Sequence, residues 1–245
     1  MAATGTLYPS VWTLPSALSG RLGSEPGPQR SLLEDGHLLL VLHQIPNPDE
    51  HARRAALFWR SPDGTWRSNR PGAGLTALQA HLREYDETLI ALEQAENQAT
   101  SAAEYHTVLE RLAPVLRASR GLHRALQQAR EMVKADRNLI DLRDQTAGIE
   151  RTAELLLQDA QFGLNFTAAR QAEAQAATAR QMAATAHRLN LLASFFLPLT
   201  ALASLFGMEI HSRLADTPQN FLWIASGGLV LGSLVTLGVI RKGKP

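Results

Sequence analysis

The side chains of this sequence that could bind a metal ion are its carboxylates and its eight histidines, because the chain contains no cysteine. No pair of histidines has the i, i+4 spacing with a third ligand that a zinc site requires, and this also holds for His37 and His43. His211 lies near Glu209 and Asp216, but these three would form a site only if several copies of the chain met there. Most histidines are therefore expected to be ordinary surface or core residues.

Four acidic residues, Asp136, Asp141, Asp144 and Glu150, are close together in the sequence. They could meet a cation between subunits, or they could be solvated charges on a helix, and the second interpretation is favoured. The sequence has no G-x-x-x-x-G-K-S/T loop, no G-x-S-x-G elbow and no H-E-x-x-H motif. We therefore expect a protein that is not an enzyme and that has no tightly bound cofactor.

Three polar residues, Asn190, Thr200 and Ser204, belong to one helical frame that advances in alternating steps of three and four. The whole frame, called the seam below, is Ala176, Ala179, Ala183, Ala186, Asn190, Ala193, Leu197, Thr200, Ser204 and Gly207. Its members are small or polar, whereas bulky residues such as Phe195 and Phe206 lie off it. The seam could allow close helix packing, or it could face a narrow lumen surrounded by several copies.

Two uncharged runs near the end of the chain predict the elements that position the seam. Residues 191–208 and residues 221–240 each lack charged side chains. Runs of about this length can cross a bilayer as helices, and they predict two transmembrane helices. The alternative, a pair of buried core helices in a soluble protein, is improbable for two such runs side by side.

Basic residues predict the orientation of these helices. Among the lysines and arginines, only Arg213 lies in the linking segment 209–220. This segment is so short that the two helices must form an antiparallel hairpin. The basic residues outside the hairpin are Arg170, Arg180, Arg188, Arg241, Lys242 and Lys244. Because basic flanks stay on the cytoplasmic side, both termini of this expected inner-membrane protein should be cytoplasmic. Residues 209–220 should then form a periplasmic loop, and residues 241–245 a basic cytoplasmic tail. The N-terminus lacks a secretory signal pattern, which agrees with this orientation.

The first part of the chain, residues 1–73, predicts a small cytoplasmic α/β domain. Residues His37–Ile45 and Ala55–Arg60 are short apolar runs, and the turn Ser61–Gly64 predicts a hairpin of Ala55–Arg60 with Thr65–Ser68.

Helix-forming residues dominate after residue 73 and predict a cytoplasmic helical domain over 74–137. Two helices are expected, at about 75–100 and 102–134, the second with a kink or break at Pro114 and Gly121. A third should start near Asn138, form a stalk over 138–190 and continue into the first span, since no proline occurs before Pro198. The fold class is thus a mainly α membrane protein.

The overall charge limits the kinds of partner. Lysine and arginine exceed aspartate and glutamate by a formal net charge of only +1. No global field therefore favours nucleic acid, and the lipid bilayer is the expected non-protein partner.

Two short motifs lie in the first predicted span: residues 196–200, Phe-Leu-Pro-Leu-Thr, and 206–208, Phe-Gly-Met. In residues and spacing they resemble the first span of the CorA family of divalent-cation channels and transporters. The resemblance implies a homopentamer in which the first span lines a pore, and the seam falls on the pore-facing frame.

The outer mouth differs from the family pattern at one position. The family carries Gly-Met-Asn, and here the residues are Gly207, Met208 and Glu209. The resemblance implies that these three residues set selectivity and that Glu209 meets a hydrated cation. Five glutamates would form a negative ring of the kind found in general cation pores.

The sequence thus predicts a channel or transporter that moves Mg²⁺ or a related divalent cation passively across the inner membrane. The expected pore-lining residues are Ala183, Ala186, Leu189, Asn190, Ala193, Leu197, Thr200, Ser204 and Gly207, with the gate at Leu189 and Leu197. One alternative is a non-conducting coiled-coil scaffold or regulatory assembly, and another is a less selective pore that responds to membrane tension.

Overall fold

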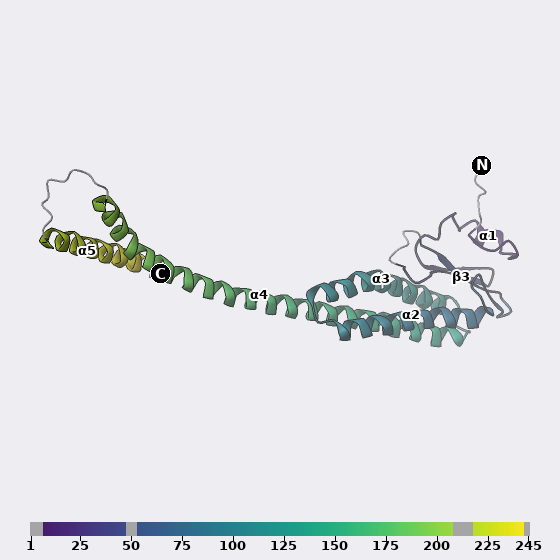
Figure 1. The fold of residues 1–245 in the computed structure, drawn as a ribbon. Helices are drawn as coiled ribbons and strands as arrows, with labels where there is room; N and C mark the ends of the chain where they lie inside the picture. The colour runs from purple at the N-terminus through teal and green to yellow at the C-terminus, as the bar shows by residue number, and fades with distance from the viewer. Residues whose placement is uncertain (1–6, 48–52, 208–217, 243–245) are drawn as a thin grey trace, which may run out of the picture. The chain divides into compact units, whose positions relative to one another are not determined.

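The computed structural model describes residues 7–47, 53–207 and 218–242, and the chain divides into two compact units (Figure 1). Unit 1 comprises residues 1–169 and unit 2 residues 170–245. Unit 1 contains a small antiparallel sheet and several helices, and unit 2 is helical in all its described residues. The chain is mainly helical with a sheet near its N-terminus, as the sequence predicts.

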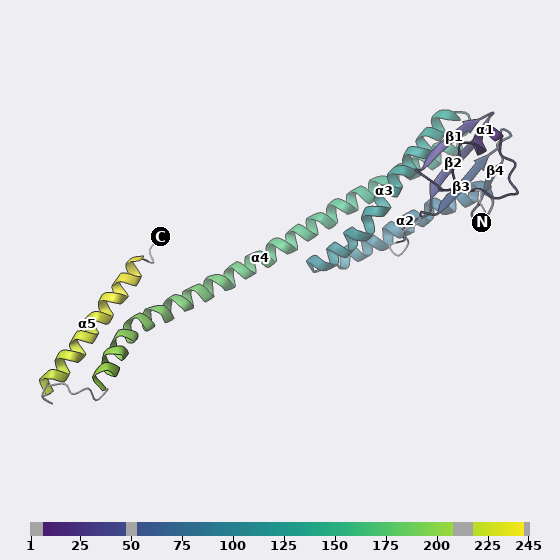
Figure 2. The same cartoon turned by 90° about the horizontal axis from the view of Figure 1, so that it is seen from above.

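The sheet is a four-stranded antiparallel meander of β1 (Arg30–Glu34), β2 (His37–His43), β3 (Ala55–Arg60) and β4 (Trp66–Ser68) (Figure 2). The hairpin predicted after Ala55–Arg60 is confirmed, since β3 pairs with β4. Strand β1 was not predicted. It joins β2 through Asp35 and Gly36, which both have positive φ, at 47° and 77°, as a tight two-residue hairpin requires.

Both faces of the sheet are buried, which explains the unbroken apolar run in β2. Leu38, Leu40 and Leu42 face the helices, whereas Leu39 and Val41 face the opposite side. On that side Trp12 and Leu18, which belongs to the short helix α1 (Ser16–Ser19), cover the sheet. A strand buried on both faces has no polar side to alternate with.

Two antiparallel helices follow, α2 (Gly74–Gln98) and α3 (Ala102–Met132), within two residues of the predicted ends. The short link is set by a capping box, in which Ser101 Oγ accepts from the Glu104 amide while the Glu104 carboxylate accepts from the Ser101 amide. The amides of Thr100 and Ser101 both donate to the Glu104 carboxylate and lower the pKa of Glu104.

The predicted kink or break at Pro114 and Gly121 does not end a helix, because α3 runs unbroken through both residues. Gly121 serves another purpose. A Cβ there would lie 2.7 Å from Gln29 Nε2, so the missing side chain makes room for Gln29 against the helix.

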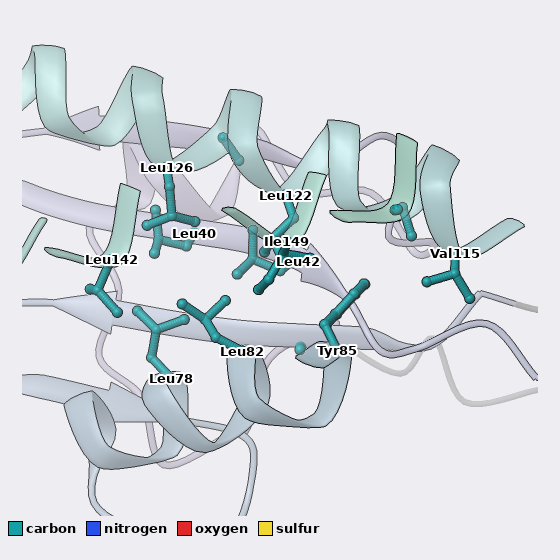
Figure 3. Close-up of a cluster of buried hydrophobic side chains, with 14 of the residues drawn as sticks. Leu40, Leu42, Leu78, Leu82, Tyr85, Val115, Leu122, Leu126, Leu142 and Ile149 are labelled. Carbon is teal, nitrogen blue, oxygen red and sulfur yellow. The ribbon is translucent and has the colours of Figure 1, made fainter. Parts of the chain in front are cut away.

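The core of unit 1 lies between the sheet and helices α2, α3 and the first part of α4 (Asn138–Gly207). Figure 3 shows Leu40 and Leu42 of the sheet meeting Leu82 and Tyr85 of α2 and Leu122 of α3. Leu142 and Ile149 of α4 complete this core. The sheet and the three helices therefore hold one another in place through a single apolar cluster.

The predicted long helix is confirmed, since α4 is continuous over 70 residues and joins the stalk segment to the segment after residue 190. Helix α5 spans Pro218–Lys242. Among the residues that the structure describes, no helix combines the length and the apolar character needed to cross a membrane. The spans predicted at 191–208 and 221–240 are thus not confirmed.

His81 is a buried polar residue of the core, with a side chain that is 0% exposed. Neither ring nitrogen has a hydrogen-bond partner, and the ring packs against Phe58 and Tyr85. Burial, reinforced by the charge of Arg70, lowers the pKa of His81 to about 4. At neutral pH the ring is therefore uncharged, and its 3.8 Å approach to Glu84 is not an ion pair.

This lowered pKa makes the stability of unit 1 depend on pH. The unfolded chain takes up a proton at His81 near pH 6.5 while the folded chain resists it to about pH 4, so stability is present above pH 6.5 and declines below it. Between pH 7.5 and pH 5, the free energy of unfolding should fall by about 2 kcal/mol less in His81→Leu than in the wild type.

Guanidinium unfolding followed by tryptophan fluorescence at both pH values measures this difference. The variant should be as stable as the wild type at pH 7.5, because an unpartnered polar ring is replaced by an apolar side chain. An equal loss of stability in both proteins on acidification would contradict the assignment.

Candidate functional site

The candidate site is the seam on α4, which lies on an exposed face of the helix. Every described side chain of the seam from Ala183 to Ser204 is exposed in the single chain. Leu197 is 67% exposed and Leu189 60% exposed, although both are apolar. The described seam residues from Ala183 to Ser204 therefore share one surface of α4 that the other described residues leave exposed.

Helix α5 packs on a different face of α4 within unit 2. Phe195, Pro198 and Leu199 are half-buried, in contrast to the seam residues beside them. Gly232 of α5 is buried, and a Cβ there would lie 2.8 Å from the backbone oxygen of Phe195. Gly228 is also buried, one turn earlier, so a small-residue edge of α5 allows the close approach.

The hydroxyl groups near the seam are oriented by the helix itself. Thr200 Oγ1 donates to the carbonyl oxygen of Phe196 at 2.7 Å, and Ser194 Oγ donates to that of Asn190 at 2.7 Å. Because each proton is directed at the backbone, each hydroxyl oxygen keeps its lone pairs free to face outward. A surface of this kind offers acceptor oxygens to a cation or to the water around one.

The predicted outer mouth lies largely outside the described residues. Gly207 is the last residue of α4. Met208 and Glu209, together with His211 and Asp216, fall in the segment 208–217 that the structure does not describe. The proposed role of Glu209 as a cation site therefore stays a prediction.

The acidic residues considered as a second cation site mostly have basic partners. Arg60 Nε lies 2.6 Å from Asp136 Oδ2, and both side chains are largely buried. Asp144 pairs with Arg143, and Glu150 lies 3.9 Å from Arg120. No group of three or more histidine, aspartate and glutamate side chains within the described ranges is arranged to hold a metal ion.

His37 and His43 lie at opposite ends of β2 and have separate roles. His37 Nδ1 accepts a hydrogen bond from Trp59 Nε1 at 3.1 Å, and His43 Nε2 lies 2.7 Å from the carbonyl oxygen of Gly27. Burial lowers the pKa of His43, and the charges of Arg53 and Arg30 lower it further. Each histidine thus has a hydrogen-bond partner within the chain.

A cavity of about 840 Å³ in unit 1 is lined by Arg53, Arg117 and Arg124, which were not predicted as site residues. The signal available in the sequence was weak. Arg117 and Arg124 are seven residues apart and so share a helix face, but nothing in the sequence places Arg53 beside them.

The family comparison covers most of the chain. Residues 70–242 match the model of the family described as CorA-like Mg²⁺ transporter protein. The chain belongs to the CorA-like Mg²⁺ transporter family. The resemblance found in the sequence is thereby confirmed, and membership assigns this CorA-like protein to metal-ion transport rather than to a family of enzymes.

Solved structures show the same CorA-like fold at low sequence identity. Full-length CmaX is 15% identical with a TM-score of 0.59, over 95% of this chain and 82% of that one. The cytoplasmic domain of ZntB from Vibrio parahaemolyticus RIMD 2210633 is 15% identical with a TM-score of 0.53, over 66% and 80%. No curated protein matches this CorA-like chain in sequence.

The contact between Gly232 and Phe195 leads to a test of the α4–α5 packing. We expect Gly232→Ala to lower the melting temperature of the purified protein, because the added Cβ must push α5 away from the backbone of α4. Gly227→Ala is the matched control, since a Cβ at Gly227 meets nothing within 4 Å. There alanine should stabilise the helix by up to about 1 kcal/mol. Equal melting temperatures for the two variants would contradict the close contact.

Proposed function

We propose that this CorA-like protein assembles as a homopentamer in the inner membrane and moves Mg²⁺ or a related divalent cation passively along a central path lined by the seam. The observation that carries the proposal is the exposure of the seam on α4, on a face that α5 leaves open. Family membership over residues 70–242 supports ion transport as its purpose.

The stalk supports assembly because a helix surrounded by water gains little stabilisation from side-chain packing. Every residue from 170 to 190 is exposed in the single chain. In proteins most of a helix's stability comes from tertiary packing, which this exposed stretch lacks in the single chain. Neighbouring copies that pack along the alanine-rich seam would supply the missing contacts.

The proposed membrane placement rests on the two uncharged runs 191–208 and 221–240. With one arginine in the link and six basic residues on the outer flanks, both termini would be cytoplasmic. The seam residues from Asn190 to Gly207 would then lie along the membrane part of the path.

Along this path the cation would move largely hydrated. It would be attracted by a ring of Glu209, pass the hydroxyl oxygens of Ser204 and Thr200, and meet the apolar girdles of Leu197 and Leu189. Rings of apolar side chains can gate a pore by excluding water, so these leucines would form the gate. The membrane potential contributes about 2.3 kcal/mol per charge per 100 mV, and twice that for a divalent ion.

Cysteine cross-linking tests the pentamer and the direction of the seam. The chain has no native cysteine, so a single introduced thiol is the only reactive one. We expect Ala186→Cys to link neighbouring subunits through a short bis-maleimide, because the seam would face the axis. A ring with an odd number of subunits always leaves one unpaired, so linking should stop at about four-fifths of the chains.

Ala184→Cys is the matched control, because it lies two residues away on nearly the opposite face of α4. It should give little linked product. Equal linking from both positions would contradict the orientation of the seam, and complete linking of Ala186→Cys would contradict a five-membered ring.

Charge removal at Glu209 tests the proposed outer site. In vesicles containing the purified protein, Glu209→Gln should slow Mg²⁺ entry on the order of tenfold at low ionic strength, because a ring of carboxylates concentrates cations at the mouth. The difference should shrink at high ionic strength, where the Debye length falls from about 30 Å to a few ångströms.

Glu209→Asn distinguishes the effect of the charge from the effect of the family's triplet, since it restores Gly-Met-Asn while removing the carboxylate. This variant should favour Mg²⁺ over monovalent cations relative to Glu209→Gln. Unchanged flux and ion preference in both variants, with the oligomer intact, would refute the outer site, and absence of flux in the wild type would favour a scaffold.

A further inference from the structure

A cavity in unit 1 lies far along the sequence from the seam and serves no purpose in the proposed ion path. Its volume is about 840 Å³, and its walls come from the loop before β1, the segments around the β2–β3 connection and one face of α3. This size falls within the range of sites that hold small organic ligands. The side chains around it are unusually one-sided in charge.

Among the described residues that line the cavity, four are arginines and one, Glu110, is acidic. The arginines are Arg53 and Arg54, which precede β3, and Arg117 and Arg124, which lie on α3. Glu110 Oε1 lies 3.3 Å from His106 Nε2 on the same helix, and its single carboxylate is outnumbered by the arginines. Because the whole chain carries a net charge of only +1, this concentration of positive charge is a local feature.

Five arginines outside the cavity form ion pairs with carboxylates. The pairs within the described residues are Arg21–Glu34, Arg60–Asp136, Arg70–Glu84, Arg120–Glu154 and Arg143–Asp144. In that same part of the chain, no carboxylate forms an ion pair with Arg53, Arg117 or Arg124. Within the described ranges, three guanidinium groups thus line one cavity without a carboxylate partner.

Hydrogen bonds hold Gln29 in place at the floor of the cavity. Gln29 Nε2 donates to the carbonyl oxygen of Ala118 at 2.7 Å, and the His43 amide donates to Gln29 Oε1 at 3.3 Å. Gly121 makes this possible, because any side chain there would collide with Gln29. The Gln44 amide donates to the carbonyl oxygen of Arg54, which ties the arginine segment to the end of β2.

The charges of the arginines also affect His43 in the cavity wall. Besides burial, the charges of Arg53 and Arg30 lower the pKa of His43, so the ring stays neutral beside the arginines. Its contact with the carbonyl oxygen of Gly27 assigns the proton to Nε2. The neutral histidine thus adds no charge of its own beside the arginines.

We propose that this arginine cavity is a binding site for a soluble phosphate-bearing anion of nucleotide size. Guanidinium groups present several donors in a planar fork that matches phosphate oxygens, and charge-assisted hydrogen bonds of this kind are stronger than neutral ones. Ile45, Pro46 and Pro114 supply an apolar wall for the uncharged part of such a ligand. The inference does not depend on ion transport, because every residue involved belongs to unit 1.

Binding of pyrophosphate and of ADP to the full-length purified protein tests the proposal. Isothermal titration in buffer with a chelator, so that no metal ion bridges the phosphates, should show saturable binding of both compounds. ADP should bind more tightly than pyrophosphate, because it also contacts the apolar wall. The affinity should fall as salt is added, since the contacts are mainly ionic.

Substitution of single arginines locates the site. Arg117→Gln and Arg124→Gln should each weaken binding on the order of tenfold, because a charge-assisted hydrogen bond is lost. Arg124→Lys should lie between Arg124→Gln and the wild type, since it keeps the charge and loses the fork. Arg117 and Arg124 are exposed, so melting temperatures should not change.

Arg120→Gln is the matched control, because Arg120 lies on the same helix but pairs with Glu154 and does not line the cavity. It should bind like the wild type. Equal weakening by Arg120→Gln, absence of saturable binding in the wild type, or binding only to vesicles that contain phosphatidylglycerol would each overturn the proposal. Loss of ion flux with binding intact would leave it standing.

Discussion

The packing of one face of the sheet against α2, α3 and the start of α4 is the interaction on which the other features of unit 1 depend. Leu40, Phe58, Leu82 and Leu122 all belong to that apolar cluster. It fixes the distance between the end of β2 and the exposed face of α3, and the arginine cavity lies in that space. The same cluster includes Leu142 and Ile149, so α4 leaves unit 1 from a packed base.

Local signals were enough to predict the elements whose ends are marked by the sequence. Helices α2 and α3 and the start of α4 were predicted closely, because helix-forming composition marks their extent and the Pro- and Gly-containing segment 70–74 marks the start of α2. Strand β1 was missed although Asp35–Gly36 is a strong hairpin signal. Its five residues are too short a run to stand out without the neighbouring strand.

A candidate site could be predicted from the sequence only where its residues lie on one helix or strand. The seam could be derived because all its members lie on one helix, where spacing alone fixes the shared face. The arginine cavity could not, since Arg53 meets Arg117 and Arg124 only after the sheet has packed on α3. Of the kink or break predicted at Pro114 and Gly121, the break does not occur. Pro114 removes one backbone donor, a cost that the packing around Leu112, Val115 and Leu116 outweighs.

The hydrogen bond from Thr200 to the carbonyl oxygen of Phe196 also bears on the sign of any ion that meets the seam. The dipole of this hydroxyl is oriented before the ion arrives, so a cation finds an electronegative wall with almost no reorganisation energy. An anion would first have to break the bond and turn the proton outward, at a cost of about 1 kcal/mol for each subunit. Discrimination by charge would then begin in the folded helix itself, before any acidic residue contributes.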